Sequence, residues 1–160
     1  HYPLRRQRQM CIRDSTQTTL SVDETKSIIS ILRDRFPKII TPKKDDICYA
    51  TQNRQDAVKQ LALESDFMIV VGSKNSSNSN RLKELGENCG CKSVLIDEFN
   101  DLDLDVIKKF SRISITAGAS APESKVMEIA QSLESYIGPE ILEYGEDNEE
   151  IFFKLPPGLR

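Results

Sequence analysis

Residues 67–82 of this 160-residue chain, FMIVVGSKNSSNSNRL, give the clearest indication of its fold class. Its first part, FMIVVG, is short, continuous and rich in branched apolar residues, which predicts a strand buried on both faces. From Ser73 to Asn80, every residue except Lys74 is serine or asparagine, and a helix is predicted from about Asn78 to Gly86. A strand, a polar turn and a helix form half of a parallel α/β unit, in which ligands bind at the carboxyl ends of the strands.

The rest of the chain repeats this alternation of strands and helices. Helices are predicted from Ser21 to Pro37, from about residue 52 to 64, around 104–110 and over 122–137. Strands are predicted over 67–72, 93–97 and 112–116, with a final one in EEIFFKL, residues 149–155. The sequence therefore predicts an α/β fold with a parallel sheet and right-handed crossovers.

The composition limits the possible functions. The chain is 38% hydrophobic and 29% charged, with a formal net charge of -3, which is typical of a soluble protein of one or two domains. The acidity argues against a nucleic-acid partner, and we expect no membrane span because no apolar run approaches roughly 18 residues. No secretion signal is evident, so the four cysteines are expected to stay reduced in the cytoplasm.

The first fifteen residues differ from the body. They contain four arginines and one aspartate, whereas the remainder has 18 basic and 24 acidic residues. A basic arm for an anionic partner is one interpretation, and we favour a non-native leader resembling translated linker sequence. His1, the single histidine of the chain, lies in this segment, so Ser–His–Asp and Cys–His arrangements are excluded for the body. Phosphate-binding glycine motifs of the Walker and dinucleotide types are absent too.

Four polar turns precede helices, and together they predict an anion site. They are TQTTLS, CYAT, GSKNSSNS and TAGASAP, ahead of helices near residues 22, 52, 78 and 122. Helix amino termini offer free N–H donors and partial positive charge, so converging turns of this kind suit a phosphate or diphosphate. The alternative is plain capping: one of Ser76, Ser77 and Asn78 caps a helix, and Thr18 and Ser120 do the same.

Cys48 has two interpretations as well. A lone cysteine between Ile47 and Tyr49 is often a buried small hydrophobe. At a helix amino terminus it is instead a stabilised thiolate, which serves as a nucleophile or metal ligand. Cys89 and Cys91 have the spacing C-x-C rather than the C-x-x-C of zinc and redox sites, so we assign them no role.

Four ordered motifs resemble the carboxyl-terminal half of the LytB family of 4-hydroxy-3-methylbut-2-enyl diphosphate reductases. They are TQTTLSVDET, DDICYATQNRQDAV, VVGSKNSSNSNRL and ITAGASAPE, and the resemblance extends from Thr16 to the end. It implies an oxidoreductase of non-mevalonate isoprenoid biosynthesis, which removes a hydroxyl from an allylic diphosphate to give isopentenyl and dimethylallyl diphosphates. It also implies three similar α/β modules around a 4Fe-4S cluster and an electron donor such as ferredoxin or flavodoxin.

The resemblance implies a role for each matching residue. Cys48 corresponds to a cluster-ligating cysteine, and Thr18 to a threonine that positions the substrate hydroxyl and its proton supply. Diphosphate-binding residues correspond to Ser76, Ser77, Asn78 and Ser120. A thiolate-bound iron with an open position fits such chemistry.

The chain also lacks parts of the family pattern. Two further cluster cysteines, the diphosphate-binding histidines and a glutamate proton donor belong to an amino-terminal half that has no counterpart here. We therefore expect a fragment that is inactive alone: the end of a second module (16–44), a third module (45–138) and a tail (139–160). The alternative is a non-redox module that binds a diphosphate ligand and in which Cys48 is structural.

Overall fold

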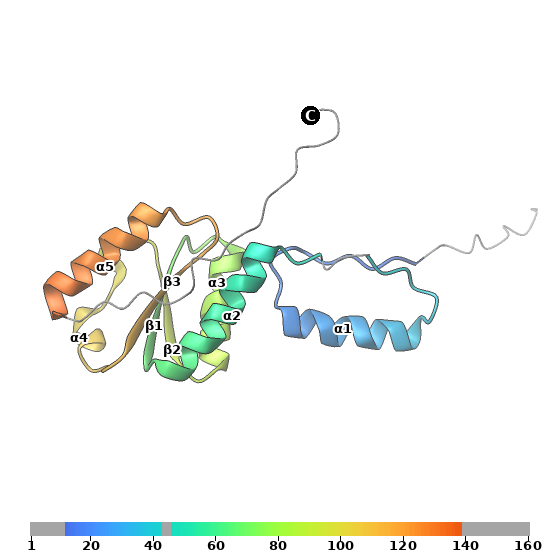
Figure 1. The fold of residues 1–160 in the computed structure, drawn as a ribbon, viewed down its shortest axis with the longest axis horizontal. Coiled ribbons are helices and arrows are strands. Elements are labelled where there is room, and N and C mark those ends of the chain that lie inside the picture. The colour runs from blue at the N-terminus through green and yellow to red at the C-terminus, as the bar shows by residue number, and fades with distance from the viewer. Residues whose placement is uncertain (1–11, 43–45, 139–160) are drawn as a thin grey trace, which may run out of the picture.

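The computed structural model describes residues 12–42 and 46–138 (Figure 1). The strand predicted over 149–155 and most of the predicted leader lie outside these ranges. Residues 12–14 are described, and they form a short parallel pairing with Ile40: Ile40 N–H donates to Ile12 O at 2.9 Å, and Asp14 N–H donates to Ile40 O at 3.3 Å. No helix in the described ranges is both long and apolar enough to cross a membrane.

The predicted parallel sheet is confirmed. It contains β1 (Phe67–Val71), β2 (Lys92–Ile96) and β3 (Ile113–Ala117) in the order β2-β1-β3, with every pairing parallel. In register, Phe67 lies beside Lys92 on one side and Ile113 on the other. Because β1 is the central strand, all five of its residues are buried, which explains its continuous apolar sequence.

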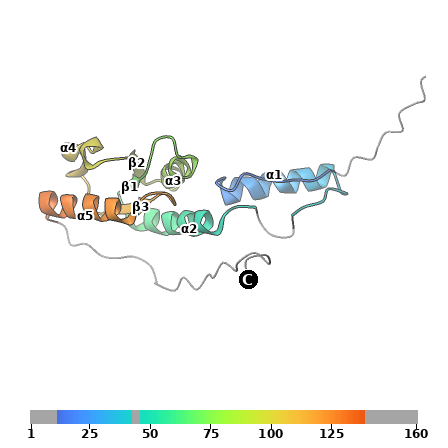
Figure 2. The same ribbon diagram turned by 90° about the horizontal axis from the view of Figure 1, so that it is seen from above.

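Helices cover both faces of the sheet, as the two views show (Figures 1 and 2). One face packs against α2 (Tyr49–Glu64) and α3 (Ser77–Asn88), and the other against α4 (Leu104–Ile107) and α5 (Glu123–Ile137), with a short 3₁₀ turn, η1, at Phe99–Asp101. Alternate residues of β1 enter the two cores. Met68 and Val70 pack on the α2–α3 side, while Phe67, Ile69 and Val71 pack on the α4–α5 side.

Local capping explains where the helices begin and end. The Ser76 hydroxyl accepts a hydrogen bond from the Ser79 N–H at 3.3 Å and so starts α3. Asp103 Oδ1 accepts from the Asp105 N–H at 3.1 Å and starts α4. The helix α5 ends at Gly138, whose φ of +67° is the left-handed conformation that glycine adopts without a steric penalty.

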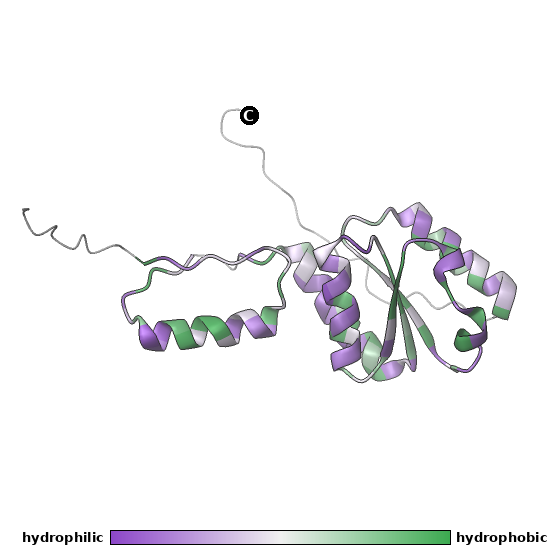
Figure 3. Cartoon of the chain, turned by 180° about the vertical axis from the view of Figure 1, so that it is seen from behind, coloured by the Kyte–Doolittle hydropathy of each residue, from purple (hydrophilic) through white to green (hydrophobic). Residues whose placement is uncertain are grey.

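The helix α1 (Val22–Arg35) lies to one side of this sandwich (Figure 1). Its amino-terminal end is held by ion pairs: Asp23 with Lys59 of α2 at 2.7 Å, and Glu24 with Arg81 of α3 at 3.3 Å. Hydrophobic residues alternate with hydrophilic ones along α1 (Figure 3), and two of them, Ile28 and Ile31, are 59% and 66% exposed. Ile29 and Leu32 are half-buried, so the described residues cover α1 only in part.

Candidate functional site

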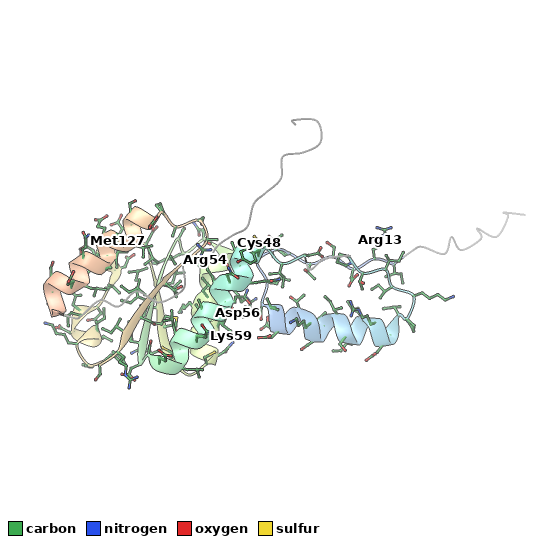
Figure 4. The ribbon with its side chains drawn as sticks, in the orientation of Figure 1. Arg13, Cys48, Arg54, Asp56, Lys59 and Met127 are labelled. Atoms are coloured by element: carbon green, nitrogen blue, oxygen red, sulfur yellow. The ribbon has the colours of Figure 1, made fainter. Side chains whose placement is uncertain are left out.

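The predicted site residues come from segments that meet at one edge of the sheet. The strands β1 and β3 are parallel neighbours, so their carboxyl ends lie side by side, followed by Gly72 and Gly118. The amino-terminal end of α2 reaches the same edge, because Arg54 Nε donates to the Ala117 carbonyl at 3.1 Å. Figure 4 shows Cys48 and Arg54 at that end of α2.

Two glycines allow α3 to approach this edge closely. A Cβ added to either Gly72 or Gly118 would collide with the Ser79 hydroxyl, which therefore lies between the ends of β1 and β3. Ser79 is fully buried in the first turn of α3. The two glycines and Ser79 thus fix the start of α3, with its polar residues, against the ends of both strands.

Asn78 and Ser79 both have buried polar atoms without partners at this edge. Asn78 is 94% buried, given its exposed fraction of 6%, and both its Oδ1 and its Nδ2 have no hydrogen-bond partner among the described residues, nor has the Ser79 hydroxyl. Its Nδ2 lies 3.8 Å from the place that a Cβ on Gly118 would occupy. Leaving buried polar groups unpaired costs about 1–3 kcal/mol each, so both atoms of this amide are free to bond to a further group.

The other three predicted diphosphate residues surround Asn78 along the chain and across the sheet edge. Ser76 is half-buried and caps α3, whereas Ser77 is exposed in its first turn. Ser120 is exposed in the turn after β3, where the Ala121 N–H donates to Gly118 O at 3.0 Å. The structure therefore brings the Ser76–Asn78 turn and the Ser120 turn to the same edge.

Thr18 and Cys48 are also neighbours. The Cys48 N–H donates to the Thr18 carbonyl at 3.0 Å, and both residues are exposed. Cys48 is the N-cap of the 16-residue helix α2 and makes no side-chain capping bond. It is therefore an accessible thiol at a helix amino terminus, and it does not occupy the buried position of a small hydrophobe.

The donor set does not complete an iron–sulfur site by itself. A 4Fe-4S cluster is normally held by four thiolates, and the part of the chain that the structure describes brings no three potential metal ligands together. Cys89 and Cys91 lie between α3 and β2, at the opposite edge of the sheet. Cys91 is buried, and burial raises the pKa of its thiol. Among the described cysteines, Cys48 is thus the one at this edge.

Two hollows are present elsewhere in the described residues. One is formed by α1 together with Thr16 of the TQTTLS turn, Asp46 and Gln52, and the other lies between α5 and the η1 turn. Neither is lined by the Ser76–Asn78 turn or the Ser120 turn, so the candidate diphosphate site is neither of these two hollows.

Sequence reasoning missed four residues that shape the site. They are Gly72 and Gly118, which admit Ser79, and Arg54 and Gln55, which connect α2 to other segments. A glycine directly after a buried strand was visible in both GSKNSSNS and TAGAS. The partners of Arg54 and Gln55 are distant in sequence, so no local pattern indicates them.

Comparisons with known proteins show the family to which this chain belongs. The family model described as LytB protein matches residues 4–134. The 4-hydroxy-3-methylbut-2-enyl diphosphate reductases of Saccharophagus degradans and Alcanivorax borkumensis are 55% and 52% identical to this chain over 145 residues, 91% of its length. The chain spans 47% of the length of each.

A solved structure is similar along the same length. The E-1-hydroxy-2-methyl-but-2-enyl-4-diphosphate reductase of Plasmodium falciparum superimposes with a TM-score of 0.83 at 33% identity, covering 92% of this chain and 47% of that one. With the family model matching most of the chain, these likenesses identify the sequence: it belongs to the LytB family.

Proposed function

We propose that this chain is the part of a 4-hydroxy-3-methylbut-2-enyl diphosphate reductase that holds the diphosphate and supplies one cluster ligand. The observation that supports the diphosphate site best is the Asn78 amide, which is 94% buried and has two unpartnered polar atoms at the start of α3. The relatives' names supply the substrate. Together they favour a diphosphate over an unspecified anion.

The diphosphate would bind through hydrogen bonds from short side chains and helix ends. The Asn78 amide, the hydroxyls of Ser76 and Ser77, and the Ser120 hydroxyl provide donors from two neighbouring turns. The α3 amino terminus adds free N–H groups and a partial positive charge. Charge-assisted bonds to phosphate oxygens are roughly twice as strong as neutral ones, which favours the anion in spite of the chain's net charge of -3.

The reaction would be a two-electron reductive dehydroxylation. The substrate's C–O bond breaks, and two electrons and two protons convert the substrate to an isopentenyl or dimethylallyl diphosphate and water. Ferredoxin or flavodoxin would supply the electrons. The Thr18 hydroxyl, exposed beside the start of α2, would position the leaving hydroxyl and its proton.

Cys48 would contribute one thiolate to the 4Fe-4S cluster that serves this reduction. The remaining ligands must come from residues outside the described ranges or from the half of the relatives that this chain does not span. We therefore expect no reductase activity from the chain alone. Because Cys48 needs a reduced thiol for this role, a cytoplasmic location is part of the proposal.

A non-redox diphosphate-binding module is the second candidate. It is favoured by the presence of one cysteine at the site edge among the described residues. The two candidates share the diphosphate site and differ in the function of Cys48.

Titration calorimetry with inorganic pyrophosphate tests the shared site. We expect Asn78→Ala to weaken binding about tenfold or more, because the lost hydrogen bonds are to a charged group. Its free energy of unfolding should stay the same or rise, since Asn78 is unpartnered in the folded chain. Asn88→Ala, an exposed change at the other end of α3, is the control. Equal affinity of Asn78→Ala and wild type would contradict the diphosphate site.

The function of Cys48 is tested by reconstitution. The amino-terminal half of a Saccharophagus degradans relative is supplied in trans, and the mixture is loaded anaerobically with iron and sulfide. Cluster absorbance and substrate reduction should appear with wild type and be lost in Cys48→Ser, while pyrophosphate affinity is unchanged. Equal cluster loading in Cys48→Ser would favour the non-redox module.

A further inference from the structure

The helix α2 connects the segments of the site through two consecutive side chains. Gln55 is 99% buried and uses both ends of its amide: Oε1 accepts from the Val22 N–H at 3.1 Å, and Nε2 donates to Leu20 O at 2.9 Å. These bonds hold the segment that follows Thr18 against α2. A buried amide with both ends paired has one orientation, so it fixes the backbone that it contacts.

Arg54 makes the corresponding connection on another side of α2. Its Nε donates to Ala117 O at 3.1 Å, at the end of β3, and its Nη1 donates to Ala50 O in the first turn of its own helix at 3.3 Å. Consecutive helical residues point about 100° apart, which is why neighbours in sequence reach two different segments. Figure 4 shows Arg54 below Cys48, on the same helix.

Cys48 and the two connecting residues all belong to the start of α2. Cys48 is its N-cap, Gln55 holds the Thr18 segment, and Arg54 holds the strand end that leads to Ser120. An α-helix is rigid over two turns, so Gln55 and Arg54 stay at fixed positions relative to Cys48. The segments that these two side chains bind are therefore held at fixed distances from Cys48.

We propose that Gln55 and Arg54 are positioning residues: Gln55 fixes the Thr18 segment relative to Cys48, and Arg54 fixes the Ser120 turn. This inference rests on the proposed function, because it assigns the purpose of the two connections to that site. The simpler alternative is that both residues only stabilise the fold. The two alternatives predict different results when each side chain is replaced. Positioning residues should change amide protection or pyrophosphate affinity locally, whereas purely structural residues should lower protection throughout the fold.

Amide hydrogen exchange tests Gln55. In Gln55→Leu, the Val22 and Cys48 amides should exchange at least about tenfold faster, because a lost buried hydrogen bond has that effect on local opening. The Ile69 amide in central β1 should keep its protection, and pyrophosphate affinity should be unchanged. Gln60→Leu, an exposed change on α2, is the control. Uniform loss of protection, Ile69 included, would show a purely structural role and overturn the inference.

Gln55→Glu covers the case in which Gln55→Leu does not fold. The glutamate can accept from the Val22 N–H, but its ionised form has no proton to donate to Leu20 O. Compared with wild type at each pH, the Val22 amide should stay protected, whereas protection at Cys48 should be low at neutral pH and return as the carboxyl is protonated and can donate to Leu20 O. Protection that does not depend on pH would contradict the assignment.

Pyrophosphate binding tests the role of Arg54. Arg54→Met should weaken pyrophosphate binding about tenfold and leave the Val22 and Cys48 amides protected. Gln55→Leu should do the opposite, losing the protection and keeping the affinity. Arg54→Lys keeps the charge but not the paired donors, so it should restore only part of the affinity. Arg33→Met, an exposed change on α1, is the control. If Arg54→Lys binds pyrophosphate as tightly as wild type, the positive charge of Arg54 explains the affinity, and the positioning role is overturned.

Failure of the proposed function can be distinguished from failure of this inference. If wild type does not bind pyrophosphate, the diphosphate proposal fails. Arg54 is then judged by exchange of the Ala121 amide, which donates to Gly118 O in the Ser120 turn. Faster exchange of that amide in Arg54→Met would support its positioning role, and an unchanged rate would overturn it.

Discussion

The Cys48 N–H donates a hydrogen bond to the carbonyl oxygen of Thr18 at 3.0 Å. The bond joins the proposed cluster ligand to the residue proposed to position the substrate hydroxyl, although 30 positions separate them in the sequence. It is made by backbone atoms alone, so it does not depend on either side chain. Both side chains are exposed and remain available for chemistry.

Changing these two side chains should therefore leave the fold intact. We expect Thr18→Val and Cys48→Ala each to alter the free energy of unfolding by less than about 0.5 kcal/mol, which is the usual scale for exposed positions. Denaturant unfolding followed by circular dichroism measures this. Leu82→Ala, at a fully buried position, should cost about 2–5 kcal/mol and shows that the assay detects a loss.

Ser76 has a capping role and a proposed binding role, and two substitutions separate them. Ser76→Gly should cost only a few tenths of a kcal/mol, because glycine is an acceptable N-cap, but it should weaken pyrophosphate binding. Ser76→Asp should keep the cap and repel the anion. Calorimetry and thermal unfolding of the same samples check both effects. Unchanged affinity in Ser76→Asp would rule out a diphosphate at this turn.

The close contact among Gly72, Ser79 and Gly118 predicts a rescue. Gly118→Ala should destabilise the chain by about 1–3 kcal/mol through overpacking against the Ser79 hydroxyl. Adding Ser79→Ala should recover most of this loss, because the new Cβ would then lie 3.4 Å from the Ser79 Cβ. For Gly72→Ala the corresponding distance is 3.0 Å, so Ser79→Ala should rescue it less. Equal rescue of both would show that the hydroxyl does not separate the two strand ends.

The Asp23–Lys59 ion pair should make stability depend on pH. The hydrogen bond from Lys59 lowers the pKa of Asp23 from its ordinary 3.8, and the same bond raises the pKa of Lys59 above 10.5. The ion pair therefore contributes its whole stabilisation at pH values between 3.8 and 10.5. It is lost as pH falls through the lowered aspartate pKa and as pH rises through the raised lysine pKa.

The pair is partly exposed, with side-chain exposures of 33% for Lys59 and 64% for Asp23, so its contribution should be about 0–1 kcal/mol. Asp23→Asn should be less stable than wild type at pH 7, and the difference should vanish in strong acid. Asp34→Asn, an exposed change on the same helix, serves as the reference. A difference that persists in strong acid would assign the effect to something other than the ion pair.

The described cysteines should differ in reactivity. Cys48 and Cys89 are exposed, whereas Cys91 is 2% exposed and burial raises the pKa of its thiol. Because the thiolate is the nucleophile, iodoacetamide at neutral pH should alkylate Cys48 and Cys89 well before Cys91. Peptide mass spectrometry gives the rate at each site. Rapid labelling of Cys91 would show that β2 separates readily from α2 and α3.

Much of the fold followed from local patterns. The apolar run at 67–71 and the turn residues after it are short-range features, and they predicted a buried parallel strand with a helix behind it. Ser21 and Gly138 set helix boundaries through their own conformations and bonds. The exposure of Ile28 and Ile31 did not follow from local patterns. Helical periodicity shows which side chains share a face but not whether another element covers that face.

For the site, local patterns predicted the residue types: serines and asparagines at helix starts, one cysteine before α2, and the motifs of the LytB family. Which of these residues meet depends on the tertiary structure. The parallel pairing of β1 with β3 put two polar turns at one edge, and the burial of Asn78 left its amide without partners. Gln55 and Arg54 contact residues more than 30 positions away. Such contacts depend on the packing of whole elements, which local propensity does not encode.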